Sequence, residues 1–73
     1  MSEETKFLLM SLVDKMVYLV MNEYKLSMSQ ALDLVYTSET YSKIEDLETG
    51  LYYQSAAYNF NLLKHEIAYG KIV

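Results

Sequence analysis

The chain contains one histidine, His65, and imidazole is the side chain most often used for acid–base chemistry near neutral pH. Asn61 and Tyr69 stand four residues before and after it, so a helix would align the three as a polar stripe. Glu66 is adjacent in sequence, but adjacent helical side chains point apart. The spacing indicates a solvated face near a helix end. We therefore predict that the protein is not an enzyme and has no catalytic residues.

The carboxylates of the middle region are the only other candidates for ionic chemistry. Asp46-Leu47-Glu48 resembles the start of a calcium loop, but the remaining ligand positions of that pattern are missing. The absence of cysteine excludes disulfides and thiolate metal sites. We therefore predict no metal and no cofactor. We expect an acidic, solvated patch, formed by Asp33, Glu39, Glu45, Asp46 and Glu48.

The best candidates for recognition are aromatic. The candidate interaction surface comprises Tyr52, Tyr53, Gln54 and Tyr58. Tyrosine provides a large contact area and a polar tip at low entropic cost, which is why binding surfaces are rich in it. The alternative is structural, with one tyrosine of the adjacent pair filling the core and the other covering the loop.

The size of the chain favours self-association. Its 73 residues allow one domain, covering residues 1–73, and domains this small are marginally stable without help. Apolar residues make up 52% of the chain and 8 residues are tyrosine, more than one small core requires. We therefore predict a homo-oligomer, with a further protein partner as a possibility.

Charge and hydropathy argue against several partners. The net charge is −4 and there is no arginine, whereas nucleic-acid binders cluster Lys and Arg to displace counterions. Anionic membrane surfaces require a similar basic patch. The apolar run at 7–21 is too short and too charged to span a bilayer. The acidic start does not resemble a signal peptide. We expect a cytoplasmic protein that binds neither nucleic acid nor membrane.

Periodicity predicts an all-α fold, a small bundle of three to four helices at about 3–24, 28–36, 39–45 and 55–69, with an ordered loop at 46–54. Ser2 and Ser27 are candidate N-caps, the second in a capping box with Gln30. Either Thr37 or Ser38 caps the third helix. We expect the first and last helices to pack antiparallel around the middle pair.

The start of the last helix has two interpretations. Thr49 would cap a helix that begins at Gly50, whereas Ser55 would cap one that begins at Ala56. Glycine is costly in a first turn, and a clean apolar period begins just after Ser55, so we favour Ser55. Gly50 then supplies a positive φ in a turn, and Gly70 ends the helix. We expect residues 71–73 to form a frayed tail unless they dock on a partner.

The first helix carries a wider apolar arc than one packing partner needs. One stripe contains Phe7, Met10, Val13, Val17, Val20 and Tyr24. The second is the candidate oligomer interface, Leu8, Leu12, Met16 and Leu19, while Tyr18 falls on the polar strip with Asp14 and Lys15. Alternatively, the chain itself covers both stripes. In the second helix we expect Met28, Ala31, Leu32 and Val35 to face inward. The five methionines are core filler or an adaptable groove.

From Leu26 to Ile67 the sequence resembles a family of short, all-helical bacterial domains of unknown function. The matching elements are an S-x-x-x-A-L helix start (Ser27 to Leu32), S-x-T-Y (Ser38 to Tyr41), L-x-T-G-L-Y-x-Q-S (Leu47 to Ser55), and a final L-L-x-x-E ending at Glu66. Similarity is strongest from Leu47 to Ser55 and includes no catalytic signature. The resemblance implies a helical fold and a regulatory or antitoxin-like binding role.

The leading hypothesis is a non-enzymatic protein-interaction module that self-associates; a place in a regulatory or antitoxin-like pair is the specific form of this hypothesis. One alternative is a nucleic-acid-associated transcriptional regulator, since the second and third helices resemble a helix-turn-helix, although the charge opposes it. Another is a small ligand-binding protein, which would need a pocket lined by Tyr52, Asn61 and His65.

Overall fold

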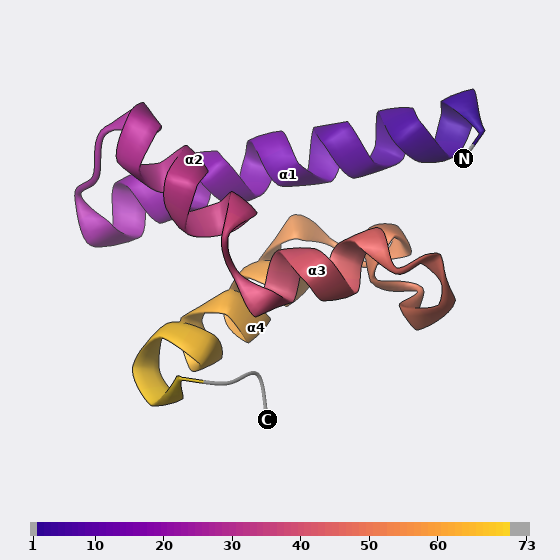
Figure 1. The fold of residues 1–73 in the computed structure, drawn as a ribbon. Coiled ribbons are helices and arrows are strands. Elements are labelled where there is room, and N and C mark those ends of the chain that lie inside the picture. The colour runs from indigo at the N-terminus through magenta and orange to yellow at the C-terminus, as the bar shows by residue number, and fades with distance from the viewer. Residues whose placement is uncertain (1, 71–73) are drawn as a thin grey trace.

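Four α-helices follow one another in the computed structural model, which describes residues 2–70 (Figure 1). They are α1 (Glu3–Tyr24), α2 (Met28–Tyr36), α3 (Glu39–Glu45) and α4 (Ala56–Tyr69). Two single 3₁₀ turns, η1 (Leu47–Thr49) and η2 (Leu51–Tyr53), occupy the connection between α3 and α4. The predicted all-α class and helix bounds are confirmed. The expected frayed tail at 71–73 lies outside the described residues.

A serine hydroxyl caps the start of each of these helices, which explains how the chain can form separate helices without proline between them. Each hydroxyl accepts a hydrogen bond from a backbone N–H in the first turn, a bond worth about 1 kcal/mol per helix. The pairs are Ser2 with Thr5 at 3.1 Å, Ser27 with Gln30 at 3.2 Å, Ser38 with Tyr41 at 3.0 Å and Ser55 with Tyr58 at 3.0 Å. Gln30 Oε1 also accepts from Ser27 N at 3.0 Å, so the predicted capping box is present.

Helix α1 ends in a left-handed residue that is not glycine. Lys25 has φ +56°, and its N–H donates to the carbonyl of Met21. The left-handed conformation places Cβ close to the carbonyl oxygen and costs about 1–2 kcal/mol for an L-residue. The turn between α1 and α2 therefore holds a small strain that the sequence did not reveal.

The core is built on one side of α1. Its buried residues Leu9, Leu12, Val13, Met16, Val17 and Val20 contact Ala31 and Val35 of α2, Ile44 of α3, and Phe60 and Leu63 of α4. Each of the two predicted stripes of α1 therefore contains both buried and exposed residues. Phe7 and Met10, which belong to the first stripe, are exposed.

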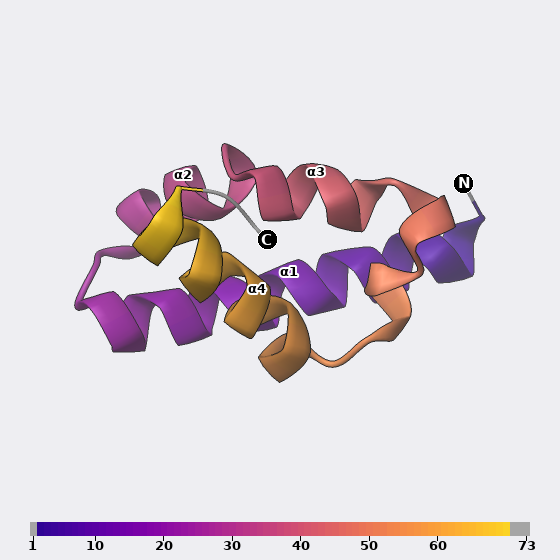
Figure 2. The same ribbon diagram turned by 90° about the horizontal axis from the view of Figure 1, so that it is seen from below.

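The direction of α4 corrects the expected antiparallel arrangement. Figures 1 and 2 show α1 and α4 running obliquely in the same general direction, while α3 runs against both. The chain from Tyr52 to Ala56 lies along α1 and runs from Leu8 toward Leu19. Helix α4 therefore starts in the same direction as α1. The reason is that η1 and η2 carry the chain back to the start of α1 before α4 begins.

A carboxylate of α4 joins it to α3. Glu66 Oε2 accepts from the N–H of Glu39 at 2.9 Å, and Oε1 accepts from the N–H and hydroxyl of Thr40 at 2.9 and 2.7 Å. The short α3 is therefore capped by a residue that lies 26 positions further along the chain. Partial burial raises the pKa of Glu66, but these hydrogen bonds lower it more, so it lies below the ordinary 4.5.

Candidate functional site

The segment from Asp46 to Ser55 is an ordered connection made of two turns. The N–H of Gly50 donates to the carbonyl of Leu47 at 3.2 Å, and the N–H of Tyr53 donates to the carbonyl of Gly50 at 3.1 Å. Gly50 joins the turns with φ +70°, a left-handed conformation that favours glycine. The predicted loop, its turn at Gly50 and the cap at Ser55 are all confirmed.

Thr49 holds the loop from within. Its Oγ1 lies 2.7 Å from the carbonyl oxygen of Lys43 and 2.9 Å from that of Asp46, and accepts from the N–H of Leu51 at 3.2 Å. Thr49 therefore closes the first turn and does not cap a helix at Gly50. These bonds are local, because each joins residues no more than six positions apart in the sequence.

Asn59 attaches the loop to α4. It is fully buried, and its Nδ2 donates to the carbonyls of Leu51 at 3.0 Å and Ser55 at 3.1 Å. Its Oδ1 is buried and accepts no hydrogen bond from the described residues. Sequence reasoning missed this residue, because an asparagine in an amphipathic helix gives no sign that it faces inward.

The two adjacent tyrosines have different positions. Tyr52 is half-buried and packs against the core cluster, whereas 72% of Tyr53 is exposed. Their ring centroids are 4.3 Å apart. A hydrogen bond with Tyr53 and partial burial raise the pKa of Tyr52. Tyr52 therefore fills the space between loop and core, and Tyr53 covers it.

The outer part of the candidate interaction surface is continuous with α1. Gln54 and Tyr58 are exposed, as Tyr53 is. A shallow hollow of about 190 Å³ lies between the loop and α1 and is lined by Leu8, Ser11, Leu12, Lys15 and residues 52–56. Tyr52, Tyr53 and Gln54 therefore line one hollow, whereas Tyr58 is exposed in the first turn of α4 and does not line it. We call the predicted set the loop surface: Tyr52, Tyr53, Gln54 and Tyr58.

The candidate oligomer interface on α1 is wrong for two of its four residues. Leu12 and Met16 are 6% and 0% exposed, because α4 and α2 cover them within the same chain. Leu19 is half-buried against the same core, and only Leu8 is exposed. The arc was wide because one chain covers most of it, so this stripe is mainly core.

A second apolar surface lies on the opposite side of α1 and continues onto α2. We call it the α1–α2 face: Tyr18, Met21, Met28, Leu32 and Tyr36. Tyr18 and Met28 are 67% and 60% exposed, so the expectation that Met28 and Leu32 face inward is wrong. Ala31 and Val35 alone supply the buried side of α2. The sequence does contain a signal for this second, outward stripe of α2. Residues 28, 32 and 36 recur every four positions, and residues 32 and 36 each follow a buried residue, Ala31 or Val35, by one position.

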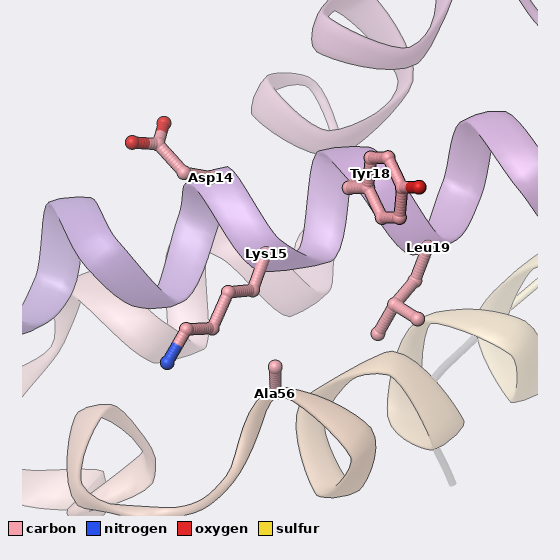
Figure 3. Close-up of a pocket in the computed structure, with 5 residues that line it drawn as sticks. All are labelled: Asp14, Lys15, Tyr18, Leu19 and Ala56. Carbon is pink, nitrogen blue, oxygen red and sulfur yellow. The ribbon is translucent and has the colours of Figure 1, made fainter.

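Hollows lie on both sides of Tyr18. On the α4 side, one of about 430 Å³ is lined by Asp14, Lys15, Tyr18, Leu19 and Ala56. Figure 3 shows Lys15 and Leu19 extending toward the start of α4, where Ala56 points back at α1, while Asp14 points away from α4. On the α2 side, one of about 340 Å³ is lined by Asp14, Val17 and Tyr18 together with Met21, Met28 and Leu32.

The residues proposed for a small-ligand pocket do not meet. Asn61 and His65 lie on the exposed side of α4, with the His65 ring 4.6 Å from that of Tyr69, and the hollow lined by Tyr52 contains neither. The five carboxylates of the predicted acidic patch are all exposed. Within residues 2–70, no three His, Asp or Glu side chains are placed to hold a metal ion together.

Comparison with known proteins gives no relative: no protein-family profile, curated protein or solved structure matches the chain. The resemblance to short bacterial domains therefore stays a prediction.

No helix within residues 2–70 is long and apolar enough to cross a membrane.

Proposed function

We propose that this protein is a non-enzymatic interaction module that self-associates and offers a tyrosine-rich surface to a protein partner. The supporting observation is the apolar surface that the fold leaves uncovered. Within residues 2–70, twelve large hydrophobic side chains are exposed, five of them tyrosine, on a chain of 8.5 kDa. Contiguous apolar patches larger than a few hundred Å² are rare on monomeric proteins and usually mark contact sites.

Two features of the loop surface suit recognition. The loop beneath it is held by Thr49 and Asn59, so Tyr53 projects from backbone that is already ordered and little entropy is lost on binding. Tyr53 and Tyr58 also present both apolar rings and polar tips, which is typical of binding hot spots.

Sedimentation velocity over a concentration series tests the self-association. We expect the weight-average mass to rise from near 8.5 kDa toward at least twice that value as concentration increases. A mass that stays at one chain up to hundreds of micromolar would contradict the proposal. Circular dichroism on the same samples establishes that the chain under test is folded.

A further inference from the structure

We propose that two copies of this chain pair through the α1–α2 face about a two-fold axis. This inference rests on the proposed self-association and adds the surface at which it occurs. The candidate competing with it is the loop surface, which Tyr53 dominates. Two properties of the α1–α2 face favour a second copy as its occupant: its area and its shape.

The area agrees with what a stable dimer needs. A standard interface covers about 800 Å² on each partner, of which about 55–65% is apolar. The four exposed members of the face, Tyr18, Met28, Leu32 and Tyr36, are 67%, 60%, 36% and 49% exposed. Taking about 150–250 Å² for each whole side chain, their exposed parts amount to roughly 320–530 Å². The face therefore supplies most of the apolar part of one standard interface.

The shape of the face is complementary to itself. In a two-fold contact the same patch serves both partners, so a projection and the hollow that receives it must both belong to that patch. Tyr18 is the projection, and the hollow lined by Met21, Met28 and Leu32 adjoins it. Each Tyr18 ring then packs into the partner's α2-side hollow. The Tyr36 ring is held edge-on by Tyr41 at 4.8 Å, which fixes the far end of the face.

The charged residues at the rim of the face are acidic. Asp14 borders the α2-side hollow, and Asp33 borders a further hollow lined by Met28, Ser29, Leu32 and Tyr36. Lys15 borders only the hollows on the α4 side of Tyr18. Two copies therefore bring four carboxylates to the rim of the contact, and added salt should strengthen the pairing by screening them.

Charge substitution at exposed positions tests the assignment without disturbing the core. Tyr18→Glu and Met28→Glu each enter a two-fold interface twice, so each is expected to raise the dimer Kd by about 100-fold or more. Tyr53→Glu is the matched control, since Tyr53 is exposed to a similar extent on the other surface. It should dimerise as the wild type does. Sedimentation gives the Kd, and circular dichroism checks that each variant is folded.

A cysteine pair gives a positive readout, because the chain has no cysteine of its own. Mixed Tyr18→Cys and Met28→Cys chains should form a cross-chain disulfide under mild oxidation, which requires Cα atoms within about 7 Å. Absence of this disulfide in a dimeric mixture would overturn the packing of Tyr18 beside Met28.

The outcomes distinguish self-association from pairing through the α1–α2 face. A monomeric wild-type chain would contradict both. A wild-type dimer that Tyr18→Glu and Met28→Glu leave intact retains self-association and overturns the α1–α2 face. Dissociation by Tyr53→Glu alone would also overturn it, and would assign the interface to the loop surface.

Discussion

Replacing Glu66 by glutamine should destabilise the protein through the start of α3, about 26 residues away in sequence. Glutamine keeps the size of the side chain and one acceptor oxygen but removes the negative charge. The wild-type carboxylate accepts three hydrogen bonds, from the N–H groups of Glu39 and Thr40 and from the Thr40 hydroxyl, at 2.9, 2.9 and 2.7 Å. The amide can replace only part of this arrangement.

The expected loss follows from these bonds. A hydrogen bond to a charged group is worth about 1.5–3 kcal/mol, but Glu66 is only half-buried, glutamine retains some bonding, and such values are not additive. We expect Glu66→Gln to lower the free energy of unfolding by about 1–2 kcal/mol. For a domain of this size each kcal/mol lowers Tm by about 4–8 °C.

The pH dependence identifies the charge as the cause. The pKa of Glu66 is lower in the folded than in the unfolded chain, so its contribution is fully present above the unfolded value, near 4.5. It is lost as pH falls through the lower, folded pKa. The wild type and Glu66→Gln should therefore differ at neutral pH and converge in acid.

Urea unfolding monitored by circular dichroism, at a series of pH values, measures this difference. The exposed Glu48→Gln is the matched control, since it removes the same charge from η1 without breaking a side-chain hydrogen bond seen in the structure. If Glu66→Gln is as stable as the control at neutral pH, the carboxylate does not hold α3. If the loss is the same at every pH, the ionic explanation is wrong.

Four further substitutions test other local features, each by thermal and urea unfolding. Lys25→Gly should stabilise by up to ~1 kcal/mol, because it relieves the left-handed residue after α1. Asn59→Asp should destabilise by about 3 kcal/mol or more at neutral pH, because a buried carboxylate cannot donate to the two carbonyls that Nδ2 contacts. Tyr52→Ala should cost about 2 kcal/mol, whereas Tyr53→Ala should change stability by less than about 0.5 kcal/mol.

Local signals predicted the helices well. Serine caps, the Ser27–Gln30 box and the glycines at 50 and 70 act through backbone groups a few residues away, so they can be recognised in a linear sequence. The same holds for the loop before α4, where Thr49 and Ser55 compete as caps. Thr49 closes the preceding turn instead, because its hydroxyl reaches back to Lys43 and Asp46.

The tertiary features could not be predicted in the same way. The bond from Glu66 to Thr40 and the burial of Asn59 depend on how α4 crosses the bundle, and no local pattern encodes that direction. The faces of α1 were misassigned for a related reason. Its apolar arc is wide, and only the positions of α2 and α4 decide that Met16 is buried.

The α1–α2 face went unrecognised because its members were divided between two incorrect assignments. Tyr18 was grouped with charged neighbours as polar, although a tyrosine ring is largely apolar. Met28 and Leu32 were placed in the core with Ala31. A nine-residue helix on the outside of a bundle buries only one narrow stripe, so the second stripe had to face outward.

The mass of the folded wild-type chain in solution tests the central claim most directly. Sedimentation equilibrium at neutral pH, from micromolar to hundreds of micromolar chain, measures it without labels or variants. The account predicts a concentration-dependent rise from 8.5 kDa to a plateau at twice that mass, with helical content unchanged. A single-chain mass across the whole range would contradict self-association and, with it, the role assigned to the α1–α2 face.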